Sequence, residues 1–437
     1  MLTRISKKTW WGLAMITTTL LILAGSVWTK ESPTVVAQVT PPEEGVICTE
    51  DAGSNPTFTL NTQTGYVGTP DDNVIFMWGL SEGTNQFQHP GPILCINEGD
   101  TVTIILHNSL PEDISMMFPG QDNVLANGQP AQPQFDNLGN LTSLTNVAPA
   151  NGGSVTYSFV ANHPGSFVYE SGTNPAIQVR MGLFGGMIVR PALGPNYVNN
   201  RLDSEFNPDE EYMVLFSEID PYLNQAVERG DTFDLNLYKP RYWLLNGRGF
   251  PDTIAPNFAS WLPSQPYGAL ARVHPYDAGS NPLYAVEHFL NVGSDIVPMH
   301  PHGKNALIVS RDGRSMAGAG GEDLAQEHFS IPVGPGQTYD GLFRWVNQEQ
   351  YDPITNPVPV TIPNLQNLNV GLLYSGSPYL GDQDTVPVGT TTLNQCGEYY
   401  IISHNHALFK ITSWGVPATG PITFMRIDPP LPNNCPS

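Results

Sequence analysis

Turn-forming residues interrupt this chain so often that long helices have little room. The 437 residues include 42 glycines and 41 prolines, and charged residues make up only 13%. Short runs rich in β-forming side chains lie between these breaks, at residues 101–106, 154–160, 186–189, 212–216 and 306–309. Gly, Pro, Asn or Asp bounds each run, and these residues form turns. Many short strands with frequent turns favour β-sandwiches or β-barrels.

The N-terminal segment has the layout of an export signal. Arg4, Lys7 and Lys8 precede an apolar run over residues 10–28, and the small residues Val36 and Ala37 follow a polar stretch. A basic start, an apolar run and a small-residue cleavage site are typical of a secretory signal peptide. We therefore predict that residues 1–37 are a signal peptide and that the protein is periplasmic or extracellular. The run is long enough to serve as an uncleaved membrane anchor, and only then would a membrane be a partner.

A boundary between two domains is expected after residues 190–195, which read RPALGP. An Asn- and Asp-rich stretch follows this segment. We predict a first domain over residues 45–192, a linker over 193–207 and a second domain over 208–430. The second domain is long for one sandwich, so the Pro- and Asn-rich segments at residues 254–282 and 349–394 are interpreted as long loop insertions.

The net charge argues against some classes of binding partner, and the cysteine content indicates the redox state of the compartment. The formal net charge is −22, and it becomes more negative once the basic signal segment is removed. A polyanion repels a nucleic-acid backbone, so no nucleic-acid partner is expected. The four cysteines are Cys48, Cys95, Cys396 and Cys435. An even number in an exported chain predicts disulfides. Three pairings are open, and the most local one joins Cys48 to Cys95 and Cys396 to Cys435.

Two His-X-His pairs carry the strongest chemical signal in the chain. They are His300-Pro301-His302 and His404-Asn405-His406, which together hold four of the 10 histidines. On a strand, residues two apart project from the same face, so each pair would present both imidazoles together. Two such strands side by side would aim four nitrogens at a common point, a cluster that suits copper or zinc. The alternative is a hydrogen-bonded group of partly buried histidines, and the presence of two pairs favours the metal.

Ten short motifs follow one another in a fixed order. The first predicted domain contains GPIL at 91–94, NEGDTV at 97–102, LHNSL at 106–110, PGSFVY at 164–169 and MGLFGG at 181–186. The second contains LNGRGFPDT at 245–253, VPMHPHG at 297–303, RDG at 311–313, PGQTYD at 335–340 and HNH at 404–406. In this order they resemble the multicopper oxidases. The resemblance implies an all-β fold of two tandem cupredoxin-like Greek-key β-sandwich domains.

The resemblance also implies a trinuclear copper cluster that four His-X-His pairs hold, two from each of two cupredoxin domains. His300, His302, His404 and His406 stand at ligand positions of the second domain. The corresponding positions of the first domain carry no histidine; they are Met117, Pro119, Glu170 and Gly172. The chain therefore keeps half of the cluster ligands. The thioethers of Met116, Met117 and Met299 could hold Cu(I), but apolar gap-filling is the simpler interpretation. Glu170 could bind a harder metal such as manganese, or pair with Arg180 or Arg190.

Family members also have a blue-copper site that passes electrons from substrate to the cluster, which reduces dioxygen to water. The positions of its two histidines and its cysteine are occupied here by Val297, Lys410 and Asn405, and its axial methionine would fall near Gly415. A blue-copper site needs thiolate and imidazole ligands. The usual route of electron entry is therefore missing, and no catalytic residue is assigned.

We predict from these features an exported multicopper-oxidase-like protein that binds one or two copper ions, or zinc or manganese, through His300, His302, His404 and His406. It would lack the blue-copper site needed for ordinary oxidase turnover. In two-domain members of the family the cluster lies between subunits, so the resemblance implies a homotrimer with the histidines at an interface. Two alternatives remain: a metal-free scaffold on a degenerate oxidase fold, and an oxidoreductase with altered, metal-oxidising chemistry.

Overall fold

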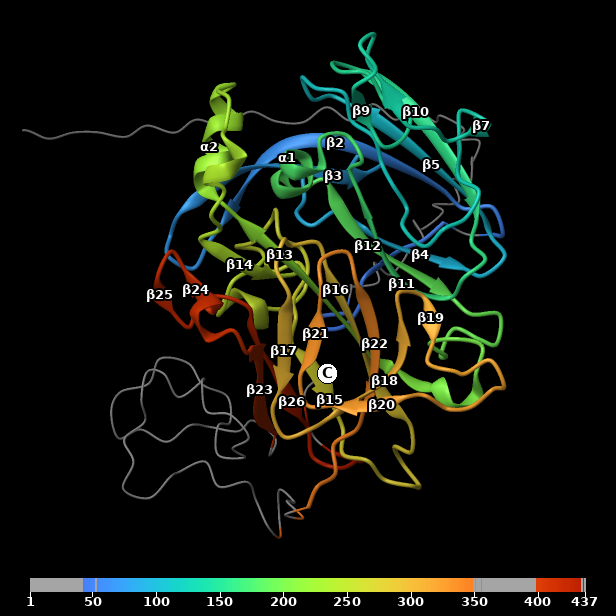
Figure 1. The fold of residues 1–437 in the computed structure, drawn as a ribbon. Coiled ribbons are helices and arrows are strands. Elements are labelled where there is room, and N and C mark those ends of the chain that lie inside the picture. The colour runs from blue at the N-terminus through green and yellow to red at the C-terminus, as the bar shows by residue number, and fades with distance from the viewer. Residues whose placement is uncertain are drawn as a thin grey trace, which may run out of the picture. The chain divides into compact units, whose positions relative to one another are not determined.

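The structure is a computed structural model that describes residues 42–348 except 52, together with residues 350, 355, 398–433 and 435. Within these ranges the chain is built mainly of strands (Figure 1). All five runs that the sequence marks as β-forming lie in strands. The all-β prediction is therefore confirmed. The insertion predicted at residues 349–394 falls almost wholly outside the described residues.

Two sheets from the first half of the chain form one sandwich. The four-stranded sheet has the order β1 (Cys48–Thr49), β4 (Ile93–Asn97), β12 (Phe184–Arg190) and β11 (Gly165–Glu170). The six-stranded sheet has the order β3 (Val74–Glu82), β2 (Thr57–Gly68), β5 (Thr101–Asn108), β10 (Gly153–Val160), β6 (Leu125–Ala126) and β7 (Gln129–Pro130). Strands β8 (Gln134–Phe135) and β9 (Leu141–Ser143) pair separately. The core between the two sheets includes Leu60, Leu94, Tyr157, Phe167 and Met187.

Two larger sheets form a second sandwich. Along the main path of the nine-stranded sheet lie β19 (Arg314–Ser315), β18 (Ala306–Arg311), β22 (Thr338–Phe343), β16 (Tyr284–Asn291), β13 (Phe206–Ile219), β14 (Tyr242–Leu245), β24 (Thr412–Ser413) and β25 (Val416–Pro417); β20 (Gln326–His328) pairs with β18. The five-stranded sheet has the order β15 (Ala271–Val273), β26 (Ile422–Ile427), β23 (Tyr399–Asn405), β17 (Val297–Pro301) and β21 (Ile331–Val333). Their shared core includes Val214, Phe289, Met299 and Ile331. The domain limits 45–192 and 208–430 stay a prediction.

The four-stranded sheet is buried on both faces, which explains the unbroken apolar run of β4. Because successive residues of a strand face opposite sides, Leu94 enters the core of the first sandwich while Ile93 points the other way. Ile93 packs in a third apolar layer with Met213 and Leu290 of the nine-stranded sheet. This layer joins the two sandwiches.

Helices are short among the described residues. They are α1 (Pro175–Met181), α2 (Pro221–Arg229) and the 3-10 turns η1 (Leu202–Ser204), η2 (Leu235–Leu237), η3 (Asp252–Ile254) and η5 (Leu408–Lys410). Helix α2 begins where the Asp220 side chain accepts a hydrogen bond from the Tyr222 amide, and it ends at Gly230, whose φ of 73° is easy only for glycine. In the described part of the chain, no helix has the length and apolar character needed to cross a membrane.

A disulfide joins Cys48 of β1 to Cys95 of β4, with Cα atoms 5.4 Å apart. This confirms one bridge of the local pairing. Cys396, which joins Cys435 in that local pairing, lies outside the described residues. Because β1 has only two residues, the bridge fixes a strand that backbone pairing alone would hold weakly.

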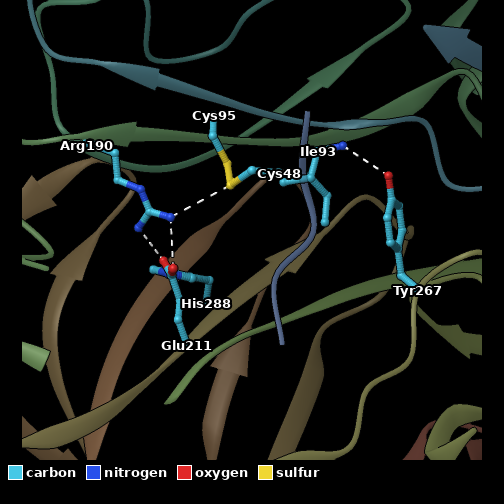
Figure 2. The surroundings of a disulfide bond; sticks show 7 residues. All are labelled: Cys48, Ile93, Cys95, Arg190, Glu211, Tyr267 and His288. Carbon is cyan, nitrogen blue, oxygen red and sulfur yellow. Dashed lines mark hydrogen bonds and ion pairs between the residues drawn. A yellow bond between two sulfur atoms is a disulfide. The ribbon is translucent and has the colours of Figure 1, made fainter. Parts of the chain in front are cut away.

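A chain of buried charges links the sandwiches next to this disulfide (Figure 2). Arg190, the last residue of β12, forms an ion pair with Glu211 of β13. The Glu211 carboxylate lies 2.9 Å from Nε2 of His288 on β16. Nδ1 of His288 lies 2.7 Å from Oδ1 of Asp340 and 2.8 Å from the Ser166 hydroxyl. Burial disfavours the charged form of His288, but the two carboxylates outweigh it and raise its pKa to about 9. Burial likewise opposes ionisation of Glu211, but its hydrogen bonds with His288 and Arg190 lower its pKa to about 2.

These shifts predict how stability depends on pH. The stabilisation from His288, whose pKa is raised, is complete below its ordinary value of 6.5 and is lost as the pH rises through about 9. The stabilisation from Glu211, whose pKa is lowered, is complete above 4.5 and is lost as the pH falls through about 2. We expect maximal stability between these limits, and a loss of the order of 3 kcal/mol on the alkaline side. Thermal unfolding across pH measures this, and H288Q should flatten the alkaline limb. A wild-type midpoint that does not change between pH 6.5 and 9 would contradict the assignment.

Candidate metal centre

Strands β17 and β23 are neighbours in the five-stranded sheet (Figure 1), and they bring together the four histidines of the two His-X-His pairs. Strands β17 and β23 pair antiparallel with His300 opposite His404, and His302 and His406 directly follow the two strands. The ring centroids of His300 and His302 are 4.4 Å apart, those of His302 and His404 5.1 Å, and those of His300 and His406 4.8 Å. The sequence pattern and the strand pairing thus produce one cluster of imidazoles.

Within this cluster, one nitrogen from each His-X-His pair meets the other directly, and we call these two residues, His302 and His404, the central pair. Nε2 of His302 lies 3.0 Å from Nε2 of His404. Nδ1 of His404 lies 3.0 Å from its neighbour's carbonyl oxygen, that of Asn405, and Nδ1 of His300 lies 2.6 Å from the Phe329 carbonyl oxygen. Because a carbonyl oxygen only accepts, each of these Nδ1 atoms carries the hydrogen, and the lone pair of the neutral ring is on Nε2. Backbone carbonyls therefore orient His300 and His404 in the way that metal-binding histidines usually require.

The surroundings keep the central pair neutral. Burial is the largest cause that lowers the pKa of His302, to about 4, and the charges of His300, His404 and His406 add to it. Burial also lowers the pKa of His404; its hydrogen bond to Asn405 opposes this, and the charges of His300 and His406 add to it. A metal binds the neutral imidazole. The ligand form of both side chains is thus present at neutral pH.

The spacing of the central pair suits a metal ion as well as a hydrogen bond. Two nitrogens that bind one ion at about 2.0–2.1 Å stand roughly 3 Å apart when the angle between them is near a right angle, and the observed separation is 3.0 Å. The four nitrogens do not all meet, however. In the described residues, the one set of three or more His, Cys, Asp or Glu ligand atoms within 4.8 Å of one another is Cys48, Glu50 and Cys95. The cluster therefore has a two-nitrogen centre, with His300 and His406 beside it.

The matching positions of the first sandwich hold no imidazole. Met117 and Glu170 exchange backbone hydrogen bonds of 2.8 and 3.2 Å, and the Met117 side chain lies where a Cβ on Gly172 would stand. Met117 thus fills this space, as the apolar interpretation expects. Burial raises the pKa of Glu170, partly offset by the charge of Arg180. Arg190, proposed from sequence as a partner of Glu170, pairs instead with Glu211.

The residues at the blue-copper positions do not fit copper. Val297 and Asn405 are buried and line the same small pocket. The Asn405 side-chain oxygen accepts from the Ala407 amide at 2.9 Å. Lys410 is 7% exposed, and its ammonium group lies 2.8 Å from the Asp295 carboxylate. An ammonium group excludes a second cation, and valine and asparagine supply neither thiolate nor imidazole. These residues do not form a copper site.

Sequence reasoning missed one arrangement of catalytic residue types, Ser166, His288 and Asp340. Its members come from β11, β16 and β22, which lie far apart in sequence, so no local motif indicates it. The Ser166 and Asp340 side chains are fully buried, and both ring nitrogens of His288 face carboxylates. A histidine that is protonated at neutral pH cannot act as a general base. This group is therefore structural.

Comparison with known proteins shows what the chain and its fold are similar to. A sequence profile described as "Multicopper oxidase" matches residues 83–193. L-ascorbate oxidase of Cucurbita maxima is 29% identical over 202 residues, which cover 44% of this chain and 30% of the plant protein. The chain therefore matches less than a third of that relative. The solved multicopper oxidase mgLAC aligns with a TM-score of 0.54 at 18% identity, covering 85% of this chain and 86% of that one. The blue copper oxidase from Nitrosomonas europaea gives 0.54 at 16% identity, covering 85% of each chain.

The structural matches define the class of the protein: an all-β chain of cupredoxin-like domains. The profile and the plant relative add a similarity to multicopper oxidases, over residues 83–193 for the profile and over 202 residues for the relative. The four histidines at the ends of β17 and β23 stand at the positions where the sequence resemblance places cluster ligands.

Proposed function

We propose that this protein is an exported, multicopper-oxidase-like metal-binding protein that holds a single copper ion through His302 and His404. His300 and His406 stand beside this pair. The observation that carries the proposal is the 3.0 Å approach of two neutral imidazole nitrogens in a cluster of four histidines. Zinc, which takes the same ligands, is the second choice. Manganese prefers oxygen ligands and is the least suited to this site.

The chain's own residues prepare the site in two ways. The carbonyl oxygens of Asn405 and Phe329 fix the tautomers of His404 and His300, so that no reorientation is needed when an ion enters. Burial keeps His302 neutral, so proton release does not oppose binding at neutral pH. A bound copper ion would supply Lewis acidity or a one-electron couple. We do not propose ordinary oxidase turnover. Val297, Asn405 and Lys410 form no second copper centre that could pass electrons to the copper ion at the histidines.

A metal analysis of the exported protein, purified without chelator, tests the proposal. We expect about one copper per chain by elemental mass spectrometry, a copper signal in electron paramagnetic resonance, and none of the intense visible absorption of a copper–thiolate centre. The double variant H300A/H404A should lose the metal while keeping its fold. A protein that contains no copper or zinc even after loading would overturn the proposal. An intense blue band would instead show that the residues assigned to the blue-copper positions are wrong.

A metal-free scaffold is the second candidate, and one observation favours it. The contact between His302 and His404 is already a good hydrogen bond if one ring donates and the other accepts. The cluster can therefore be stable without an ion. Under this alternative the protein takes up no metal, and H300A/H404A alters stability alone.

Two further features belong to the proposal. Residues 1–37 direct the chain to an oxidising compartment, which agrees with the disulfide between Cys48 and Cys95. We also propose a homotrimer in which a neighbouring subunit faces the histidine cluster. Exposed Phe329, Leu408 and Phe409, each more than half exposed and close in sequence or space to the cluster, would then be covered. Light scattering gives the oligomeric state directly.

A further inference from the structure

The disulfide between Cys48 and Cys95 is surrounded by groups that suit a second chemistry. Cys48 is half-buried, Cys95 is 6% exposed, and Glu50 is exposed directly after β1. One carboxylate oxygen of Glu50 and the two sulfurs all lie within 4.8 Å of one another. In the oxidised chain the two sulfurs do not bind a metal, because only a thiolate is a good metal ligand and both sulfurs are in the disulfide bond.

Arg190 places a positive charge beside one of these sulfurs (Figure 2). Its Nη2 lies 3.8 Å from Sγ of Cys48. The guanidinium group is held in place by its ion pair with Glu211, and Glu211 is in turn held by His288. A fixed cation next to a sulfur favours the thiolate over the thiol. The buried network therefore holds the guanidinium group in place beside the Cys48 sulfur.

We propose that reduction of this disulfide creates a metal site formed by Cys48, Cys95 and Glu50, selective for a thiophilic ion such as Cu(I) or Zn(II). A dithiol supplies two electrons and two protons: the S–S bond breaks, each cysteine gains a hydrogen, and the dithiol becomes a disulfide. The incoming ion then replaces the two thiol hydrogens, which leave to solvent as protons, and two metal–sulfur bonds form. Two soft sulfurs with one carboxylate favour these ions over magnesium or calcium.

This site is independent of the histidine cluster. Its ligands lie on or next to β1 and β4 of the first sandwich, whereas His404 lies on β23 and His302 directly follows β17 in the second. The exposed Glu50 gives an ion a side from which to enter. The metal-bound form depends on the redox state of the surroundings, so the site would fill only where reductant and ion occur together.

Residue-resolved alkylation of the full chain tests the proposal. The protein is reduced with a water-soluble phosphine, treated with iodoacetamide with or without Zn²⁺, and analysed by peptide mass spectrometry. We expect Zn²⁺ to slow alkylation of both Cys48 and Cys95 by roughly tenfold or more, because a metal-bound thiolate is a poor nucleophile. E50Q should lose most of this protection. E327Q removes an exposed carboxylate elsewhere and should behave as wild type.

Two outcomes would overturn the proposal. The first is an alkylation rate at Cys48 and Cys95 that Zn²⁺ does not change. The second is equal protection in wild type and E50Q, which would reduce the site to a pair of thiols. Circular dichroism of the reduced protein accompanies the assay; if reduction unfolds the chain, Zn²⁺ must restore the fold in wild type and fail to do so in E50Q. Because the readout is specific to each cysteine, zinc bound by the histidine cluster does not affect it.

Discussion

Loss of either imidazole of the central pair, in H302A or H404A, is expected to lower metal affinity by about 100-fold or more. The two Nε2 atoms are 3.0 Å apart, so one ion can bind both, and each variant removes one of its two nearest nitrogens. H300A should be milder, with a loss of roughly tenfold, because His300 contacts the pair through its ring rather than through a shared nitrogen position. Calorimetric titration with copper gives the affinities.

His328 provides the matched control. It lies on β20 of the other sheet of the same sandwich and belongs to neither His-X-His pair. H328A should bind copper as wild type does. Equal affinity losses in H300A, H302A and H404A would show that all the imidazoles contribute alike, and would contradict a two-nitrogen centre. Undiminished binding in H302A and H404A would place the metal elsewhere.

The largest expected effect on stability comes from Arg248, whose side chain is fully buried. Its guanidinium group donates to four backbone carbonyl oxygens, those of Asp252, Ala255, Pro256 and Gln265, at 2.6–3.3 Å. Burial lowers the pKa of Arg248 to about 10, so the group remains charged at neutral pH. One side chain thus organises the loop between β14 and β15, where regular pairing is sparse.

R248M should therefore destabilise the protein by about 3 kcal/mol or more, because buried carbonyls without donors each cost about 1–3 kcal/mol. The midpoint of thermal unfolding should fall by roughly 5–10 °C. R248K keeps the charge but has three donors on one nitrogen in place of the planar fork, and we expect an intermediate loss. R314M, at an exposed position of β19, should change stability by no more than about 0.5 kcal/mol. A midpoint for R248M within 2 °C of wild type, on the order of experimental error, would contradict this role.

The fold and the histidine cluster were predictable from sequence for a clear reason. Turn residues delimit the strands locally, and a His-X-His pair on a strand needs no distant information to put both rings on one face. The pairing of β17 with β23 then depends on a register between residues about a hundred positions apart, which the ordered motifs of the family supplied.

The finer properties of the centre depend on contacts that no local pattern records. The tautomer of His300 is set by the carbonyl oxygen of Phe329, a backbone atom present in every residue type. The departure from a four-nitrogen centre depends on side-chain rotation, which strand periodicity does not fix. The buried network around His288 joins residues more than a hundred positions apart in sequence. Such long-range polar contacts are specified only by the assembled sheets.

The ion pair between Lys410 and Asp295 has a consequence for how the protein matures. A cupredoxin domain that is completed by copper depends on metal supply after export, because an empty site leaves its ligands without a cation. Here the chain provides its own cation at that place, through an ammonium group that is synthesised with the polypeptide. At this end, the second sandwich can consequently reach its final form without a copper ion.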